Sequence, residues 1–379
     1  MEPVTHLLTG ACLSRAGLNR RAAYATLTMV VAAEFPDIDT LWSLRGPIEG
    51  FQHHRGITHT FLGLPFEAAL IVAGVYAWHR WRIKRAATPA SGRAKPLTAA
   101  PVRWGVLYGL ALIALLSHLL LDYTNNYGLR PFFPFNDRWY AASIVFIVDP
   151  LMLALLLGAL ILPWIFGLVN AEVGAKKQAF HGRGWAIAAL VGIAGWWGLR
   201  AVEHERALQM AMTQSMVAPT PESAATTTQT QDVDAAYVPT FLPARAALVS
   251  PDLLSPFRWS AVMDFGPVYK LAEIDTYGRT LTTGEEMYPK LGSSPAVLTA
   301  ERSKLGRAYM DWSPMPFVEV TTGGGGEDPS TTATVVTFRD PRFLGGRLGE
   351  TGRQPLTGTV ELDEAGHIVR QTMDGRVEQ

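Results

Sequence analysis

The sequence predicts an α-helical polytopic membrane domain of about five or six apolar helices, followed by a soluble β-rich domain. Apolar residues are concentrated before about residue 200, whereas charged, Gly-rich and Thr-rich segments lie mostly after it. A chain of 379 residues is long enough for two such units. The 33 basic and 33 acidic residues balance, so charge gives no reason to expect nucleic acid as a partner. The single cysteine, Cys12, excludes an intramolecular disulfide and any zinc site built from cysteines.

Four apolar runs predict membrane helices. They cover residues 61–79, 104–121, 144–169 and 185–199, and several are near the ~20 residues that cross a bilayer. Two shorter runs, 4–17 and 22–34, are separated by a basic stretch. They form either two short spans or a hairpin packed among the other helices. The membrane domain is therefore expected over residues 1–205.

The remainder divides into a linker and a second domain. Residues 206–235 are predicted to be a disordered linker, because most of the segment is rich in Pro, Ala, Thr and Gln and has no periodicity. Strand-like runs such as WSAVMDF and TATVVTF follow, separated by turn signals such as GGGGEDP. Residues 236–375 are read as one extracytoplasmic β-rich domain without a recognisable catalytic cluster.

Basic residues orient the membrane helices. Lys and Arg are enriched between residues 80 and 103, and the positive-inside rule places that loop in the cytoplasm. The basic residues near 15–21 and 176–183 agree with this orientation. Alternation along the chain then puts the 35–60 loop, the 122–143 loop and everything after about residue 200 outside.

Ionisable residues are costly at membrane depth, so they are rare there and usually functional. In this chain they gather at the predicted ends of the spans. His118 and Asp122 are four residues apart on a predicted helix and share one face. Asp37 and Asp39 are two apart just after a helix end, so an extended turn would direct both carboxylates the same way. By the predicted orientation these motifs, with the HHRGITH segment, lie at the outer ends of their helices. They predict one common pocket at the outer leaflet, which His6 joins if its segment starts outside.

The segments THLLTG, PDID, HHRGITH and SHLLLDYTNNYG resemble the motif set of the YdjM-type family of membrane-bound, metal-dependent hydrolases. The resemblance covers about residues 1–165 and implies a helical protein of the bacterial inner membrane whose substrate is poorly defined. The spacing of His118 and Asp122 is also similar to that in helical zinc phospholipase C proteins. The family resemblance implies seven metal ligands: His6, Asp37, Asp39, His54, His59, His118 and Asp122.

A hydrolase of this kind would use three or four of these ligands and leave one position on the ion open. A divalent metal, Zn²⁺ in the first place and Mn²⁺ or Mg²⁺ as alternatives, would then activate a water molecule. Asp39 is a candidate general base or bridging ligand, and Arg55 is a candidate clamp for a substrate anion. Membrane lipids are the expected surroundings, and a phospholipid or other lipid-linked phosphoester is the expected substrate class.

Other interpretations remain open at this stage. Asp37 and Asp39 would also serve as helix caps, His6 as a packing residue and Arg55 as an interfacial anchor. Buried His and Asp residues also line ion pathways, so a divalent-metal transporter or sensor is a second hypothesis. A third is a non-catalytic membrane scaffold in which the metal is structural.

Overall fold

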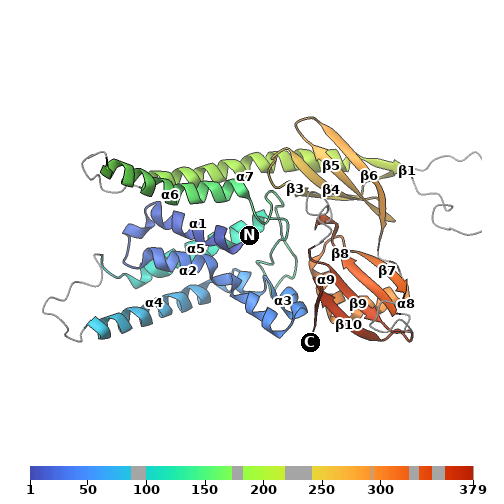
Figure 1. The fold of residues 1–379 in the computed structure, drawn as a ribbon, viewed down its shortest axis with the longest axis horizontal. Coiled ribbons are helices and arrows are strands. Elements are labelled where there is room, and N and C mark those ends of the chain that lie inside the picture. The colour runs from blue at the N-terminus through green and yellow to red at the C-terminus, as the bar shows by residue number, and fades with distance from the viewer. Residues whose placement is uncertain are drawn as a thin grey trace, which may run out of the picture. The chain divides into compact units, whose positions relative to one another are not determined.

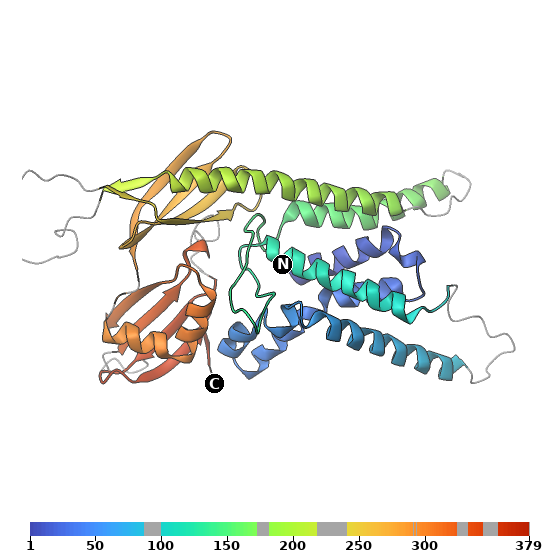
Figure 2. The same ribbon diagram turned by 180° about the vertical axis from the view of Figure 1, so that it is seen from behind.

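The computed structural model describes residues 1–86, 100–172, 182–217, 241–290, 292, 294–323, 333–343 and 355–378, and of residues 86, 167–172, 323 and 333 only the backbone. The chain divides into two compact units (Figures 1 and 2). The first unit is Met1–Ala201 with Leu253–Ser255, and the second is Val202–Asp252 with Pro256–Glu378. Residues 206–217 form the end of a helix and a short strand, and the rest of the predicted linker lies outside the described residues.

The first unit is helical. Its short elements come early in the chain, and four longer helices follow (Figure 1). The short elements are α1 (Pro3–Arg15), η1 (Leu18–Arg20), α2 (Ala25–Glu34), η2 (Phe35–Arg45), α3 (Pro47–His53) and η3 (Ile57–His59). The longer helices are α4 (Leu64–Ala86), α5 (Trp104–Thr124), α6 (Pro150–Glu172) and α7 (Arg183–Met212), the last of which continues into the second unit.

Two of the helices among the described residues, α5 and α7, are long and apolar enough to cross a membrane. A third span results if Pro47–His59 and α4 count as one element, although they are bent by 86° at the break between them. The expectation of five or six membrane helices is thus supported for two or three. The described apolar part of α6 is shorter, Pro150–Phe166. It begins later than the apolar run 144–169 because Oδ1 of Asp149 caps it, accepting from the Met152 backbone N–H at 3.0 Å.

The two N-terminal runs form α1 and α2, of 13 and 10 residues, which are too short to cross a bilayer singly. They approach closely at Gly10, where an added Cβ would lie 2.7 Å from the carbonyl oxygen of Met29 and 2.7 Å from Cβ of Ala33. The helix α2 also packs on α5, which contributes both Ala and Leu side chains to the contact. This core contains Met29, Ala32, Ala33, Leu107, Ala111, Ala114 and Leu115, all fully buried.

The second unit is β-rich, as the sequence predicts. Among its described residues, one antiparallel sheet has the order β3-β4-β5-β6 and the other β11-β10-β9-β8-β7. The first sheet is formed by β3 (Ala246–Pro251), β4 (Arg258–Asp264), β5 (Val268–Asp275) and β6 (Thr280–Pro289). The second is formed by β7 (Phe317–Gly323), β8 (Ala333–Arg339), β9 (Gly358–Leu362), β10 (Ile368–Met373) and β11 (Arg376–Val377).

Short helices cover part of the second sheet. They are α8 (Pro295–Arg302) and α9 (Lys304–Trp312), and each begins at a serine whose hydroxyl accepts a backbone N–H. Leu305 of α9 packs so closely on β9 that an added Cβ on Gly358 would lie 2.9 Å from it. The hydroxyl of Tyr309 donates to the carbonyl of Leu356 at 2.9 Å. A separate pair of strands joins β1 (Ser215–Val217) to β2 (Phe241–Pro243).

Candidate metal centre

Four side chains from three segments converge inside the helical unit. Asp37 comes from η2, His59 from η3, and His118 and Asp122 from successive turns of α5. Each offers one ligand atom, and these atoms all lie within 4.8 Å of one another. His59, His118 and Asp122 are fully buried, whereas the side chain of Asp37 is 13% exposed. The sequence predicts all four as ligands.

The distances between the ligand atoms fit a single divalent ion. Nε2 of His59 lies 3.1 Å from Nε2 of His118, 3.3 Å from Oδ1 of Asp37 and 3.3 Å from Oδ2 of Asp122. Nε2 of His118 lies 3.6 Å and 3.4 Å from the same two oxygens. Metal–ligand bonds of about 2.0–2.1 Å in a tetrahedron separate neighbouring ligand atoms by about 3.3–3.4 Å. Five of the six separations between these atoms are thus 3.1–3.6 Å, close to this spacing.

The ring orientations of the two histidines are set by partners on the far side of each ring. Nδ1 of His118 donates to the carbonyl oxygen of Ala33 at 2.7 Å. Nδ1 of His59 lies 3.2 Å from Oδ2 of Asp39. With the proton on Nδ1, each ring directs the lone pair of Nε2 toward the centre, which is the usual arrangement behind metal-bound histidines.

Asp122 presents two unlike oxygens. Oδ1 accepts from the guanidinium of Arg55 at 2.7 Å and from the amino group of Met1. Oδ2 is buried and makes no hydrogen bond among the described residues, although it faces both Nε2 atoms. A buried carboxylate oxygen without a partner is costly, and a metal ion at this point would satisfy it. The residues present therefore fit a bound cation.

Asp37 lies at the accessible side of the centre. Burial alone would raise the pKa of its carboxyl, but the hydrogen bond to His59 and the charges of His118 and His59 outweigh that effect and lower the pKa to about 2. Asp37 is therefore an anion over the whole physiological range. It is also the member of the four that lines a cavity at the surface of the unit.

The other predicted ligands surround this centre. The ring of His6 stacks on that of His118 with centroids 3.8 Å apart, and its Nε2 lies 3.5 Å from Oδ1 of Asp122. Neither ring nitrogen of His6 makes a hydrogen bond among the described residues. Asp37, Asp39 and His54 form a second group with metal-like spacing, which shares Asp37 with the first. His6 and His54 are thus brought to the site, at its edge.

Asp39 is already surrounded by donors. Oδ2 accepts from the backbone N–H of Arg55 at 2.7 Å and from the hydroxyl of Thr58 at 3.3 Å, and Oδ1 lies 3.2 Å from Nδ1 of His54. Burial by itself would raise the pKa of Asp39, but the hydrogen bonds to His54 and His59 lower it well below the usual range. Through these contacts the carboxylate of Asp39 fixes the HHRGITH loop and orients the ring of His59.

Arg55 is buried and makes several contacts through its two terminal guanidinium nitrogens, whereas its Nε makes no hydrogen bond among the described residues. Besides Asp122, its guanidinium donates to the carbonyl of Gly128 at 2.6 Å and to Oδ1 of Asn125 at 3.3 Å, and it lies over the ring of Tyr127. These bonds connect the turn between α3 and η3 to α5 and to the loop that follows α5. Arg55 thus contacts Asp122, one of the four candidate ligands, on the oxygen that does not face the centre. Its predicted role as a clamp for a substrate anion stays a prediction.

The sequence analysis missed two residues at the site. Thr58 contacts both Asp39 and His59 through its hydroxyl. Glu34, the last residue of α2, lines the same cavity as Asp37, and its Oε2 is buried without a hydrogen bond among the described residues. Glu34 could have been found from the sequence, because it is an acidic residue at the end of the apolar run 22–34 and such residues are usually functional. The hydroxyl of Thr58 gave no comparable signal.

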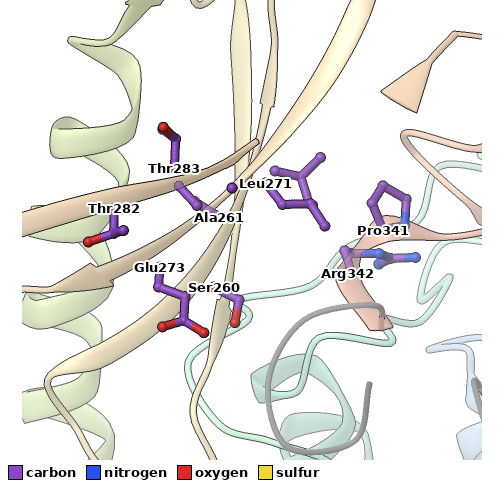
Figure 3. A pocket seen from close by; sticks show the side chains of 11 residues that line it. Ser260, Ala261, Leu271, Glu273, Thr282, Thr283, Pro341 and Arg342 are labelled. Atoms are coloured by element: carbon purple, nitrogen blue, oxygen red, sulfur yellow. The ribbon is translucent and has the colours of Figure 1, made fainter. Parts of the chain in front are cut away.

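The second unit has a cavity of its own, of about 300 Å³, between strands β4–β6 and the residues Pro341 and Arg342 (Figure 3). Ser260, Glu273 and Arg342 supply polar groups to its lining. Arg342 donates to the buried carboxylate of Asp340 at 2.9 and 2.7 Å. Both His/Asp groups with metal-like spacing that occur among the described residues lie in the helical unit. The candidate metal centre is therefore in that unit.

The fold and the site together define a protein with candidate membrane-spanning helices and a buried centre of histidines and carboxylates, followed along the chain by a β-rich region. The chain belongs to the YdjM inner membrane protein family, whose model matches residues 1–207. The family resemblance predicted from the motifs is thereby confirmed. The match includes every residue of the candidate centre and ends before the β-sheets.

Among curated proteins, the uncharacterized protein YfhP of Bacillus subtilis (strain 168) is similar to this chain. It is 25% identical over 158 residues, which is 40% of this chain and 42% of that relative. The match thus spans less than half of either protein. No solved structure matches the chain.

Proposed function

We propose that this protein is a metal-dependent hydrolase of the inner membrane that acts on a phosphoester or lipid-linked substrate at the outer leaflet. The observation that supports it most strongly is the donor set of Asp37, His59, His118 and Asp122, with its near-tetrahedral spacing and an otherwise unpaired Oδ2 on Asp122. Family membership agrees with a membrane location. The distribution of basic residues supports an outer site and an extracytoplasmic β-rich domain.

Two imidazole and two carboxylate ligands favour Zn²⁺, or Mn²⁺, over Mg²⁺, which prefers oxygen ligands and retained water. When bound, such an ion lowers the pKa of a coordinated water toward ~7 and polarises a phosphoryl or acyl oxygen. If all four residues held the ion, they would fill a tetrahedral set of positions, so a water molecule would need a further position or the place of one carboxylate. Asp37 is the ligand suited to release, because it lies at the cavity and is the most exposed of the four.

The surrounding residues have distinct tasks in this proposal. Asp39 and the Ala33 carbonyl hold the protons on Nδ1 of His59 and His118, which keeps both Nε2 atoms available. Arg55 balances the charge of Asp122 and holds its Oδ1, so that Oδ2 faces the centre. A general base must reach the water molecule, and Asp39 would do so only after giving up one of its present hydrogen bonds.

The test is metal content and hydrolysis measured on the same purified samples of the full chain. Wild-type protein should contain stoichiometric metal and cleave a generic phosphodiester, and His118→Ala and Asp122→Ala should lose both properties. His53→Ala is a matched control from the HHRGITH motif, because His53 pairs with Glu49 at 3.2 Å and is not a ligand. Metal retained in both ligand variants would refute the proposed centre.

A structural metal in a non-catalytic scaffold is the second candidate, and the four-ligand, largely buried centre favours it specifically. That function predicts stoichiometric metal and loss of folding on metal removal, without turnover of any phosphodiester by wild-type protein. A transporter is disfavoured because His118 and Asp122 lie in the last turns of α5, near one end of that candidate span.

A further inference from the structure

A cavity of about 650 Å³ opens beside the candidate metal centre. It is formed by α1, α2 and η2, which contribute the apolar side chains Leu7, Val30, Val31, Phe35, Ile38 and Leu41. Its volume lies within the usual range of small-molecule sites, about 300–1,000 Å³. Several of these side chains are also exposed on the surface of the unit, with Leu41 at 57% and Ile38 at 46%. The wall is therefore both apolar and accessible.

The polar part of the lining coincides with the candidate centre. Asp37 belongs to the four-ligand group and also lines the cavity, as does His54 of the second group. Glu34 adds a buried Oε2 atom that makes no hydrogen bond among the described residues. One cavity is thus lined both by apolar side chains and by polar residues of the candidate centre.

We propose that this cavity binds one hydrocarbon chain of a membrane lipid whose ester or phosphoester group lies at the Asp37 end. This inference rests on the proposed function and specifies its substrate class. A small, water-soluble phosphoester would make no use of the apolar wall, whereas a lipid chain gains the free energy of apolar burial along it. The surface-exposed rim on a membrane-embedded unit gives such a chain a route of entry from the bilayer.

Binding is tested separately from catalysis by photolabelling. The full chain is placed in lipid nanodiscs that contain a trace of a phosphatidylglycerol with a diazirine at the end of one acyl chain, and labelled peptides are mapped by mass spectrometry. We expect labelling to be concentrated in residues 30–41. Val31→Trp places a large ring in the cavity and should reduce this labelling about tenfold, the effect of losing the burial of roughly two methylene groups.

Leu44→Trp is the control, because Leu44 lies on η2, the segment that directly follows α2, is 85% exposed and does not line the cavity. It should label like wild type. Equal labelling of Val31→Trp and Leu44→Trp, or label spread evenly over the other exposed helices, would overturn the proposal. Metal content should remain stoichiometric in both variants, which shows that the centre is intact.

Hydrolysis provides the second measurement. For phosphodiesters of increasing chain length, kcat/KM of wild type should rise with length, Val31→Trp should remove most of this dependence, and Leu44→Trp should retain it. A kcat/KM independent of chain length in wild type would also count against the proposal. Concentrated labelling of 30–41 without turnover of any substrate would refute the hydrolase and leave the lipid-binding cavity standing, so the two failures are distinguishable.

Discussion

Asp39 stands directly behind His59, with its Oδ2 atom 3.2 Å from Nδ1 of the imidazole ring. The opposite nitrogen, Nε2, faces Asp37, His118 and Asp122. Asp39 comes from the PDID motif and His59 from the HHRGITH motif, and the loop that carries His59 is also fixed to Asp39 through the Arg55 backbone N–H. The two motifs are therefore coupled: HHRGITH supplies a candidate ligand, and PDID supplies the carboxylate that contacts the other nitrogen of its ring.

This relationship predicts the effect of Asp39→Asn. The amide keeps the shape of the side chain but loses the charge that favours a proton on Nδ1 of His59, so metal affinity should fall about 10–100-fold. Competition with a chromogenic chelator measures the dissociation constant. Asp137→Asn, an exposed position outside both candidate groups, is the control. An unchanged affinity in Asp39→Asn would show that Asp39 does not orient the ligand.

Arg55→Ala should destabilise the metal-free protein. Removing the guanidinium takes away the stronger of the two positive groups that contact the buried carboxylate of Asp122, the other being the Met1 amino group, so the loss should approach that of a broken buried ion pair, about 3–5 kcal/mol. Added metal should recover part of this loss, because the ion then balances the same carboxylate. Thermal unfolding with and without metal measures both effects. Arg45→Ala, which removes an exposed guanidinium that lies over Trp42, should be nearly neutral. Equal stability of the two variants would contradict the role given to Arg55.

Acidification should release the metal through the histidines rather than through Asp37. The pKa of Asp37 is held at about 2, below its ordinary value, so its contribution to stability is present above about pH 4 and is lost only as the pH falls through 2. His59 and His118 must be neutral to bind, and imidazole ordinarily protonates near pH ~6.5. Metal occupancy should therefore fall between about pH 6.5 and 4. Occupancy that persists to pH 4 would argue against histidine ligands.

Gly10→Ala should weaken the packing of α1 on α2. A methyl group there would meet the Met29 carbonyl oxygen and Cβ of Ala33 at 2.7 Å, and backbone cannot yield as a flexible side chain does. We expect a loss of about 1–3 kcal/mol, seen as a lower thermal unfolding midpoint. Gly109→Ala on α5 is the matched control, since nothing lies within 4 Å of its added Cβ. It should be neutral or slightly stabilising, and the reverse order would refute the close helix contact.

Orientation can be read from cysteine labelling in a Cys12→Ser background. Tyr277→Cys, at an 82% exposed position in the β-rich unit, should react with a membrane-impermeant maleimide on spheroplasts. Arg85→Cys, at the basic end of α4, should react only after permeabilisation. Labelling of Arg85→Cys on sealed spheroplasts would reverse the topology and move the candidate centre to the cytoplasmic side.

The sequence by itself determined those features that depend on local periodicity or on composition. His118 and Asp122 share one helix face because residues four apart always do so, and the β-rich second region follows from alternating patterns and turn residues. Four ordered motifs were sufficient to identify the family. Each of these inferences uses residues close together in the chain or a count over a segment.

Only the tertiary structure decided which side chains meet. The tight contact at Gly10 and the 86° bend before α4 place Asp37 and His59 against α5, whereas Asp39 is behind the ring and Arg55 is paired with Asp122. The apolar run 22–34 reads like a membrane segment, yet its last residues, Val30, Val31 and Glu34, line part of a cavity. These outcomes depend on packing between segments far apart in the chain, which local spacing does not encode.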